Sequence, residues 1–326
     1  MNILVTGAAG FIGSHLVEQL LAMGHSIISL DNLSTGKKAY LDSSLSHENH
    51  TFVHGSILDR SLLIDLMDSC DAVIHLAAVL GVKNLVNDPL KVIEGNIDGT
   101  RNILEIAYAK RIKVVFASTS EIYGKNEKIP YTEESDRVLG PTSKNRWCYA
   151  TAKALDEHLC FAYAEKGLPV TIVRYFNAYG PRAQTSDYGM VIPKFIKLAL
   201  KGQPITVYGD GTQTRSFTYI DDTIQGTILC IDNKWDGEVF NIGRPEEISI
   251  NELAEKIKQM CQSNSDIVHI PYEEVYGDKY EDTNQRVPDI TKSEQLLQFH
   301  PSTSINDGLQ QTIEWYKNAI DGREQK

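Results

Sequence analysis

The sequence predicts an α/β protein whose first half forms a doubly wound parallel β-sheet with helices on both faces. Two observations predict this fold class. Short apolar segments of strand length alternate with longer amphipathic segments through the first half of the 326 residues. The apolar runs are nearly continuous, as expected of strands that helices cover on both sides.

The expected elements follow one another along this half of the chain. Asn2–Thr6 is the first strand, and a glycine-rich turn and a helix at about residues 13–23 follow it. Long helices are expected at about residues 90–109 and 149–165. Further strands are expected at residues 26–30, 51–54, 72–76, 114–117 and 170–174.

After Gly180-Pro181 the pattern becomes less regular, which indicates a smaller α+β domain that closes over the carboxyl ends of the strands. We therefore divide the chain into residues 1–180 and 181–326, with segments around 216–243 returning to the first domain. Residues 239–242 are expected to join its sheet. Helices are expected near residues 190–200, 220–231, 250–261, 292–298 and 306–318, with a short strand at 205–207.

Composition excludes several classes of partner. A formal net charge of −11 argues against general nucleic-acid binding, because the phosphates would be repelled. No run of roughly 18 apolar residues predicts a membrane span, and the amino terminus lacks a basic leader with a cleavage site. The cysteines form no C-x-x-C pair and no zinc-like cluster with histidine, so we expect reduced thiols, a cytoplasmic protein and no metal. They are Cys70, Cys148, Cys160, Cys230 and Cys261.

A glycine-rich loop, GAAGFIG at residues 7–13, directly follows the first strand and opens the first helix. Glycines let the backbone turn sharply and approach a pyrophosphate at the helix N-terminus, so this placement predicts a Rossmann-type dinucleotide site. Asp31 ends the second strand, where its carboxylate can bind ribose hydroxyls and would repel a 2′-phosphate. NAD is therefore the expected cofactor. The alternative for Asp31-Asn32 is a helix cap or a solvated turn.

Tyr149 and Lys153 stand four residues apart on a predicted helix, so both can address one site. Tyrosine ordinarily titrates near about 10, and a lysine with an oxidised nicotinamide would stabilise the phenolate as a base. The alternative is that the tyrosine only anchors the helix. Polar groups at two strand ends, Ser118–Glu121 (STSE) and Asn177, favour a catalytic site.

Together these motifs resemble the extended short-chain dehydrogenases/reductases that act on nucleotide sugars. The resemblance runs nearly end to end. Its matching segments are residues 7–13, 76–78, 96, 118–124, 149–153, 174–182, 208–215 (YGDGTQTR) and 286–289 (RVPD). One departure is Ser56, where many relatives have an aspartate near the adenine.

The resemblance implies a role for each matching residue. Tyr149 would take the proton of the sugar C4 hydroxyl, Lys153 would tune Tyr149 and hold the nicotinamide ribose, and Thr119 would bind the same hydroxyl. Cofactor contacts are expected from Gly7, Gly10, Phe11, Ile12, Gly13, Asp31, Asn32, Ser56, Ile57, Leu76, Ala77, Ala78, Asn96, Tyr149 and Lys153. Contacts to a UDP-sugar are expected from Ser120, Asn177, Arg182, Val191, Tyr208, Arg215, Arg286 and Asp289. Without the resemblance, the alternative for each arginine is a surface salt bridge.

The expected reaction passes through a 4-keto sugar, and residue 121 directs the fate of that intermediate. A 4,6-dehydratase typically carries an Asp-Glu pair where this chain has Ser120-Glu121, which disfavours dehydration. The Thr-Ser-Glu arrangement and residues 139–149 resemble UDP-glucuronate decarboxylases. In that reading Arg286 or Arg182 seats the substrate carboxylate and Glu121 acts near C5. The alternative is a UDP-sugar 4-epimerase, in which Glu121 caps a loop or binds a sugar hydroxyl.

Two further classes are disfavoured. A non-catalytic NAD-sensing protein would not need Thr119, Tyr149 and Lys153 together, and a steroid or flavonoid reductase would not need Arg215 and Arg286 for a diphosphate. The resemblance also implies a homodimer, for which the helices at about 90–109 and 149–165 could supply a four-helix interface. The sugar 2-substituent and the fate of the hydride stay open.

Overall fold

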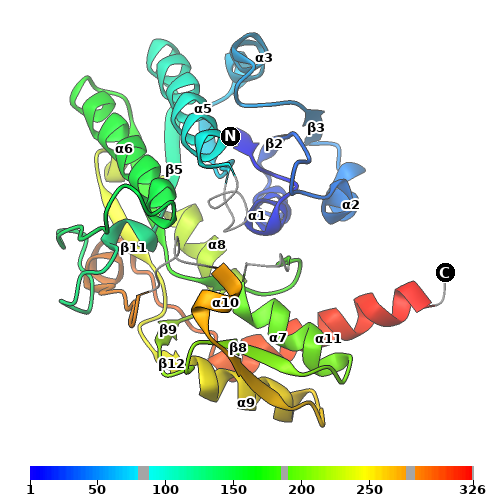
Figure 1. Cartoon of the computed structure of the whole chain (residues 1–326). Helices are drawn as coiled ribbons and strands as arrows, with labels where there is room; N and C mark the ends of the chain where they lie inside the picture. The colour runs from blue at the N-terminus through cyan, green and yellow to red at the C-terminus, as the bar shows by residue number, and fades with distance from the viewer. Residues whose placement is uncertain (80–87, 185–189, 277–282, 325–326) are drawn as a thin grey trace.

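A seven-stranded parallel sheet forms the centre of the computed structural model, which describes residues 1–79, 88–184, 190–276 and 283–324 (Figure 1). Its strand order is β11-β6-β5-β4-β1-β2-β3. These strands are β1 (Asn2–Thr6), β2 (Ser26–Asp31), β3 (His50–His54), β4 (Ala72–His75), β5 (Lys113–Thr119), β6 (Val170–Tyr175) and β11 (Val239–Ile242). From β1 the following strands are added on both sides: β2 and β3 on one side, and β4, β5, β6 and β11 on the other. This topology confirms the predicted doubly wound sheet, a fold in which ligands bind at the carboxyl ends of the strands.

Alternate residues along each strand enter two separate hydrophobic cores, one on each face of the sheet. One core packs under α1 (Phe11–Ala22), α7 (Val191–Leu200) and α8 (Ile220–Leu229) and takes Ile3, Val5, Ile74, Val115 and Val173. The other packs under α3 (Arg60–Leu66), α5 (Pro89–Lys110) and α6 (Arg146–Glu165) and takes Leu4, Val73, Val114, Phe116 and Ile172. The two covered faces explain why the strands read as continuous apolar runs.

The second half of the chain adds small strand pairs and further helices. β8 (Ile205–Tyr208) pairs with β13 (Ile267–Ile270), β9 (Thr214–Ser216) with β12 (Glu247–Ser249), and β7 (Ala178–Tyr179) with β10 (Thr218–Tyr219). β11 lies in the second half of the sequence but pairs with β6 of the seven-stranded sheet, which confirms the expectation for residues 239–242. The division of the chain at residue 180 stays a prediction. The remaining elements are α2 (Asp42–Leu45), α9 (Ile250–Met260), α10 (Tyr272–Tyr276), α11 (Ile305–Glu324), η1 (Lys38–Leu41), η2 (Met67–Ser69), η3 (Ser120–Tyr123), η4 (Asn233–Trp235) and η6 (Ser293–Leu297).

Two helix starts differ from the predicted ones. α1 begins at Phe11 because Gly10 is its N-cap, and α6 begins at Arg146 because Asn145 is its N-cap. The second difference matters for the site, since it places Arg146 on the same helix as Tyr149. Within the described residues, no helix combines the length and the apolar character needed to cross a membrane.

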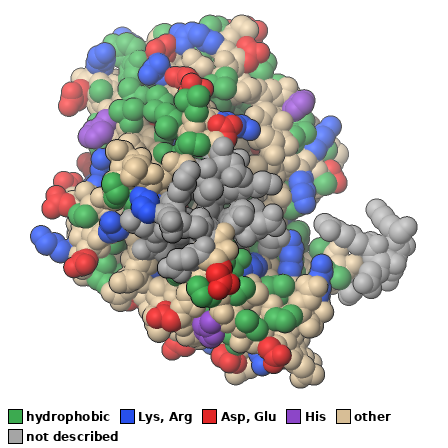
Figure 2. Space-filling model, in the orientation of Figure 1, with side chains coloured by type: hydrophobic (Ala, Val, Ile, Leu, Met, Phe, Trp, Pro, Cys, Tyr) green, Lys and Arg blue, Asp and Glu red, His purple; other side chains and the backbone are tan. Residues whose placement is uncertain are grey.

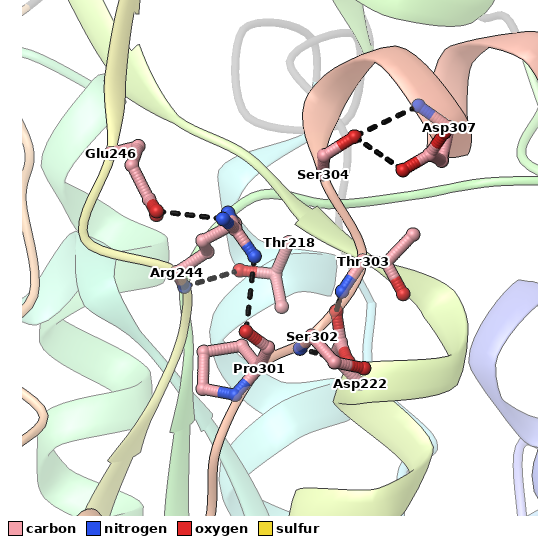
Figure 3. Close-up of polar contacts among 9 residues, drawn as sticks. All are labelled: Thr218, Asp222, Arg244, Glu246, Pro301, Ser302, Thr303, Ser304 and Asp307. Carbon is pink, nitrogen blue, oxygen red and sulfur yellow. Dashed lines mark hydrogen bonds and ion pairs between the residues drawn. The ribbon is translucent and has the colours of Figure 1, made fainter.

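Asp222 links α8 to the chain segment that precedes α11 (Figure 3). This buried carboxylate lies in the first turn of α8 and accepts backbone N–H groups of Ser302 at 2.9 Å and Thr303 at 3.1 Å. Arg244 donates to the carbonyl of Pro301 at 3.0 Å, and the backbone N–H of Asp307 donates to the Ser304 hydroxyl at 3.1 Å. These contacts join α8 and the chain after β11 to the segment that leads into α11.

Candidate active site

The glycine loop between β1 and α1 forms a cradle that only glycine permits. Gly7 has φ +72°, and a Cβ there would lie 2.9 Å from the Ala77 nitrogen. A Cβ on Gly13 would lie 2.2 Å from the Gly7 carbonyl oxygen. The N-cap Gly10 places no side chain over the start of α1, which leaves backbone N–H groups there for an anion. The cradle therefore fits the pyrophosphate of a dinucleotide.

Asp31, at the end of β2, is buried and organises this cradle. Its carboxylate accepts the N–H of Ala9 at 2.9 Å and that of Leu33 at 2.7 Å. Burial raises the pKa of Asp31, and the two N–H donors oppose that change. Asp31 therefore caps loop N–H groups and does not cap a helix, and each oxygen keeps a lone pair for a ribose hydroxyl. Asn32 is exposed and accepts the N–H of Ser34 at 3.0 Å.

The other expected cofactor residues lie after β3 and β4 at the same edge of the sheet. The Ser56 hydroxyl accepts the N–H of Leu58 at 3.2 Å, and a Cβ on Gly99 would meet Ile57 at 2.2 Å. The buried Asn96 donates to the Val79 carbonyl at 2.9 Å and accepts the Val79 N–H at 3.1 Å. Asn96 therefore shapes the loop that carries Leu76, Ala77 and Ala78, while Phe11 and Ile12 pack their side chains against the core under α1.

Tyr149 and Lys153 occupy the first half of α6, beside the carboxyl end of β5. Tyr149 is half-buried, and burial, Glu121 and Asp156 raise the pKa of Tyr149 whereas Arg146 lowers it. Lys153 is 2% exposed, with its Nζ 4.0 Å from the Phe116 ring centroid. Burial lowers the pKa of Lys153, and Asp156 is the main group that opposes this change.

A buried arginine that the sequence analysis did not assign holds the expected catalytic carboxylate. The Arg146 guanidinium, 5% exposed, lies 2.5 Å from the Glu121 carboxylate, and Thr119 Oγ1 accepts the Glu121 N–H at 3.2 Å. Thr119 and Glu121 thus sit at the end of β5 and the start of η3, facing α6. The spacing of Arg146, Tyr149 and Lys153 along one helix face is the signal that could have found Arg146.

Two of the expected substrate arginines converge beside this cluster. Arg286 is buried and its Nη1 lies 3.5 Å from the hydroxyl of the buried Ser120. Burial raises the pKa of Tyr131, while the charges of Arg286 and Arg215 both lower it. Arg215 donates to the carbonyl of Thr214 at 2.7 Å. Two buried cations here suit a diphosphate or a carboxylate.

The remaining expected substrate residues have other contacts. Asn177 donates to the Ser216 carbonyl at 2.8 Å, Val191 begins α7, and the Nζ of Lys194 lies 3.6 Å from the Tyr208 ring centroid. Arg182 pairs with Glu18 of α1 at 2.7 Å, and the Asp289 carboxylate accepts the N–H of Thr291 at 2.8 Å. Arg286, through Ser120, is therefore better connected to the catalytic cluster than Arg182.

Comparisons with known proteins agree with this geometry. The sequence model of the NAD dependent epimerase/dehydratase family matches residues 3–243. The chain is 49% identical to a UDP-N-acetyl-alpha-D-glucosaminuronate decarboxylase of Bacillus cytotoxicus, over 96% of this chain and 97% of the relative. It is 35% identical to UDP-glucuronic acid decarboxylase 1 of Xenopus tropicalis, over 98% and 73%. A solved UDP-glucuronic acid 4-epimerase of Bacillus cereus, in complex with UDP-glucuronic acid and NAD, superposes with a TM-score of 0.87 at 33% identity, covering 98% of this chain and 100% of that one.

Proposed function

The chain belongs to the NAD dependent epimerase/dehydratase family, and from this premise we propose that it is an NAD-dependent UDP-hexuronate decarboxylase. The observation that carries the proposal is the pair of buried Arg146 with the partly buried Glu121, near Tyr149. Glu121 of this pair belongs to the Thr-Ser-Glu arrangement, residues 119–121, by which the chain resembles decarboxylases. The identity of 49% over 96% of the chain to a named decarboxylase supports the same reaction.

The cofactor-binding part of the proposal rests on the cradle of Gly7, Gly10 and Gly13 and on Asp31. When bound, NAD supplies a hydride acceptor for the sugar C4. The glycine cradle and the open start of α1 would hold the pyrophosphate, and the Asp31 carboxylate would bind the adenine ribose. The same carboxylate would disfavour a 2′-phosphate by charge repulsion.

The oxidation step is assigned to three side chains on β5 and α6. Tyr149 would take the proton of the C4 hydroxyl as the hydride leaves C4, and Thr119 would hydrogen-bond that hydroxyl. Lys153 would stabilise the tyrosine phenolate by its charge, and Arg146 lowers the pKa of Tyr149 in the same direction. Because burial and Glu121 raise that pKa, these cations are needed for Tyr149 to act as a base.

The decarboxylation step uses the carbonyl that the oxidation creates. A C4 ketone lies β to the C6 carboxylate, so the C5–C6 bonding electrons can move toward the C4 oxygen as carbon dioxide leaves, after which C5 takes a proton. Glu121 is assigned to the C5 side of the sugar, with Arg146 fixing its carboxylate. Arg286 is assigned to the substrate carboxylate because it is buried beside Ser120.

Within the UDP-hexuronates, we propose UDP-N-acetylglucosaminuronate as the first substrate to test and UDP-glucuronate as the second. The relative at 49% identity is named for the former, and the relative at 35% identity for the latter. Both nucleotide sugars carry a diphosphate and a sugar carboxylate. Buried Arg215 would bind the diphosphate and buried Arg286 the carboxylate of either one.

A UDP-sugar 4-epimerase is the second candidate. The solved 4-epimerase with UDP-glucuronic acid and NAD covers 98% of the chain at a TM-score of 0.87. In that case Glu121 would serve as the structural partner of Arg146 or bind a sugar hydroxyl.

Proton NMR of the purified protein with NAD and one UDP-sugar at a time tests the proposal. The four sugars are UDP-glucuronate, UDP-N-acetylglucosaminuronate, UDP-glucose and UDP-N-acetylglucosamine, and Tyr149→Phe is the inactive control. We expect a hexuronate to lose C6 and give a pentose-type spin system. A C4 epimer that retains C6 would replace the decarboxylase with the second candidate, and an unchanged spectrum for all four would reject both.

We also propose that the chain forms a homodimer through α5 and α6. Large apolar side chains are exposed on these neighbouring helices, and hydrophobic side chains gather over them on the face shown in Figure 2. They are Leu90, Ile93 and Tyr108 on α5 and Leu155 on α6. Light scattering should give twice the chain mass, and Leu155→Glu should reduce the measured mass to that of one chain.

A cytoplasmic location is proposed from the five free cysteines.

A further inference from the structure

A fully buried carboxylate, Asp156, lies beside the catalytic lysine and has no part in the mechanism described above. It is 0% exposed, and its Oδ2 is 4.0 Å from the Lys153 Nζ, one turn along α6. The ammonium also lies against the Phe116 ring of β5. A buried charge is costly unless other groups compensate it, so the position of this carboxylate requires an explanation.

Buried polar groups on α5, β4 and β1 connect the neighbourhood of Asp156 to the loop after β4. Thr100, on α5, lowers the pKa of Asp156, which burial raises, and its Oγ1 lies 3.3 Å from Nε2 of His75. The His75 Nδ1 is 2.7 Å from the Thr6 hydroxyl, which accepts the N–H of Ala77 at 3.2 Å. These hydrogen bonds run from the loop after β4 to Thr100, and no described residue donates a hydrogen bond to either Asp156 carboxylate oxygen.

Burial lowers the pKa of His75 to about 3, so the ring is neutral and one nitrogen donates while the other accepts. The neutral histidine therefore connects Thr6 on β1 to Thr100 on α5.

We propose that Asp156 is a positioning residue for Lys153: its buried carboxylate, 4.0 Å from the Lys153 Nζ, fixes the lysine ammonium beside Tyr149. The inference rests on the proposed function only in so far as Tyr149 and Lys153 carry out the oxidation. It holds equally for decarboxylation and for 4-epimerisation, since both begin with that step.

The negative charge of Asp156 shifts the pKa values of Lys153 and Tyr149 in the same direction. The Asp156 charge raises the pKa of Lys153, which burial lowers, and it also raises the pKa of Tyr149. Asp156 itself has a pKa raised by burial to about 6, so it is charged at neutral pH. The other titratable and charged groups facing these residues are Glu157 and Cys160 on α6, His75 on β4, Glu121 on η3 and Arg146 on α6.

The test is the pH profile of kcat for Asp156→Asn, which keeps the shape of the side chain and removes its charge. Without the negative charge, Lys153 should lose its proton at lower pH, and Tyr149 should ionise at lower pH. We expect both limbs of the profile to move to lower pH, the basic limb by at least one unit, so that kcat at pH 9 falls at least tenfold relative to its optimum. Asp156→Glu, which keeps the charge, should restore the basic limb to within about 0.3 unit even where packing lowers kcat.

Asp222→Asn is the matched control, because it also neutralises a buried carboxylate but at the α8–α11 junction. It should lower the thermal midpoint and leave both limbs in place. If Asp156→Asn lowers only the thermal midpoint, as this control does, the residue is structural and the proposal fails. Should Asp156→Asn not fold, Asp156→Ser carries the same expected shift. A wild-type protein that oxidises none of the UDP-sugars would instead reject the proposed function.

Discussion

The Arg146 guanidinium lies 2.5 Å from the Glu121 carboxylate, which joins the start of α6 to the turn after β5. Both residues act on Tyr149 and with opposite signs, since Arg146 lowers and Glu121 raises the pKa of the tyrosine. The Arg146 charge therefore opposes the effect of the Glu121 carboxylate on the pKa of Tyr149. Three predictions concern this site and its cofactor, and one concerns stability.

Glu121→Gln should reduce decarboxylation about 100-fold, or about 2.7 kcal/mol in barrier, while oxidation at C4 stays detectable. Removing a negative charge beside Tyr149 should also move the acidic limb of the pH profile to lower pH. Stopped-flow absorbance of NADH and carbon dioxide release measure the two steps separately. Glu105→Gln, in the exposed pair with Arg60 at 2.7 Å, is the control and should change neither. An unchanged decarboxylation rate would return Glu121 to a structural role.

Arg146→Gln should move the acidic limb in the opposite direction. Without this cation the pKa of Tyr149 rises, so the phenolate forms at higher pH and kcat near pH 7 should fall about tenfold for each unit of displacement. The measurement is kcat from pH 5 to 9, with Arg60→Gln as the surface control. A profile displaced to lower pH would contradict the assignment of Tyr149 as the base.

Asp31→Ala should weaken NAD binding more than NADP binding, because the variant loses contacts to a ribose hydroxyl and the repulsion of a 2′-phosphate. The variant also loses the acceptor for the Ala9 and Leu33 N–H groups, which should lower the free energy of unfolding by about 1–3 kcal/mol. Calorimetric titration with both cofactors and urea unfolding measure the two effects. Equal weakening of NAD and NADP would leave Asp31 with only its loop-capping role.

His75 should make stability depend on pH in a known direction. Its folded pKa is lowered to about 3 from an ordinary 6.5, so its contribution is fully present above pH 6.5 and is lost as pH falls toward 3. The unfolding free energy of wild type minus that of His75→Asn should therefore fall by about 1.4 kcal/mol per pH unit below pH 6. Asp156 titrates in both proteins and cancels in the difference. Urea unfolding at pH 7, 6 and 5 checks this, and a constant difference would show that His75 is not held neutral.

The sequence predicted most of the sheet and the cofactor cradle because both depend on neighbours along the chain. The apolar runs locate the strands from β1 to β6. The position of GAAGFIG between β1 and α1 depends only on the local sequence and not on distant parts of the chain. Tyr149 and Lys153 were identifiable for the same reason, since a helix places residues four apart on one face. The short strands β7, β9, β10, β12 and β13 were not predicted, because segments of two to four residues carry too little periodicity.

By itself, then, the sequence determined the fold class, the glycine cradle and the tyrosine–lysine pair of this protein, because local spacing encodes them. Only the tertiary structure decided that Arg146 binds Glu121, that Arg182 binds Glu18, and that His75 lies within hydrogen-bond distance of Thr100. These partners lie between 25 and 164 residues apart along the chain. Their meeting depends on the order of the strands and on how α5 and α6 pack on the sheet, which no local pattern specifies.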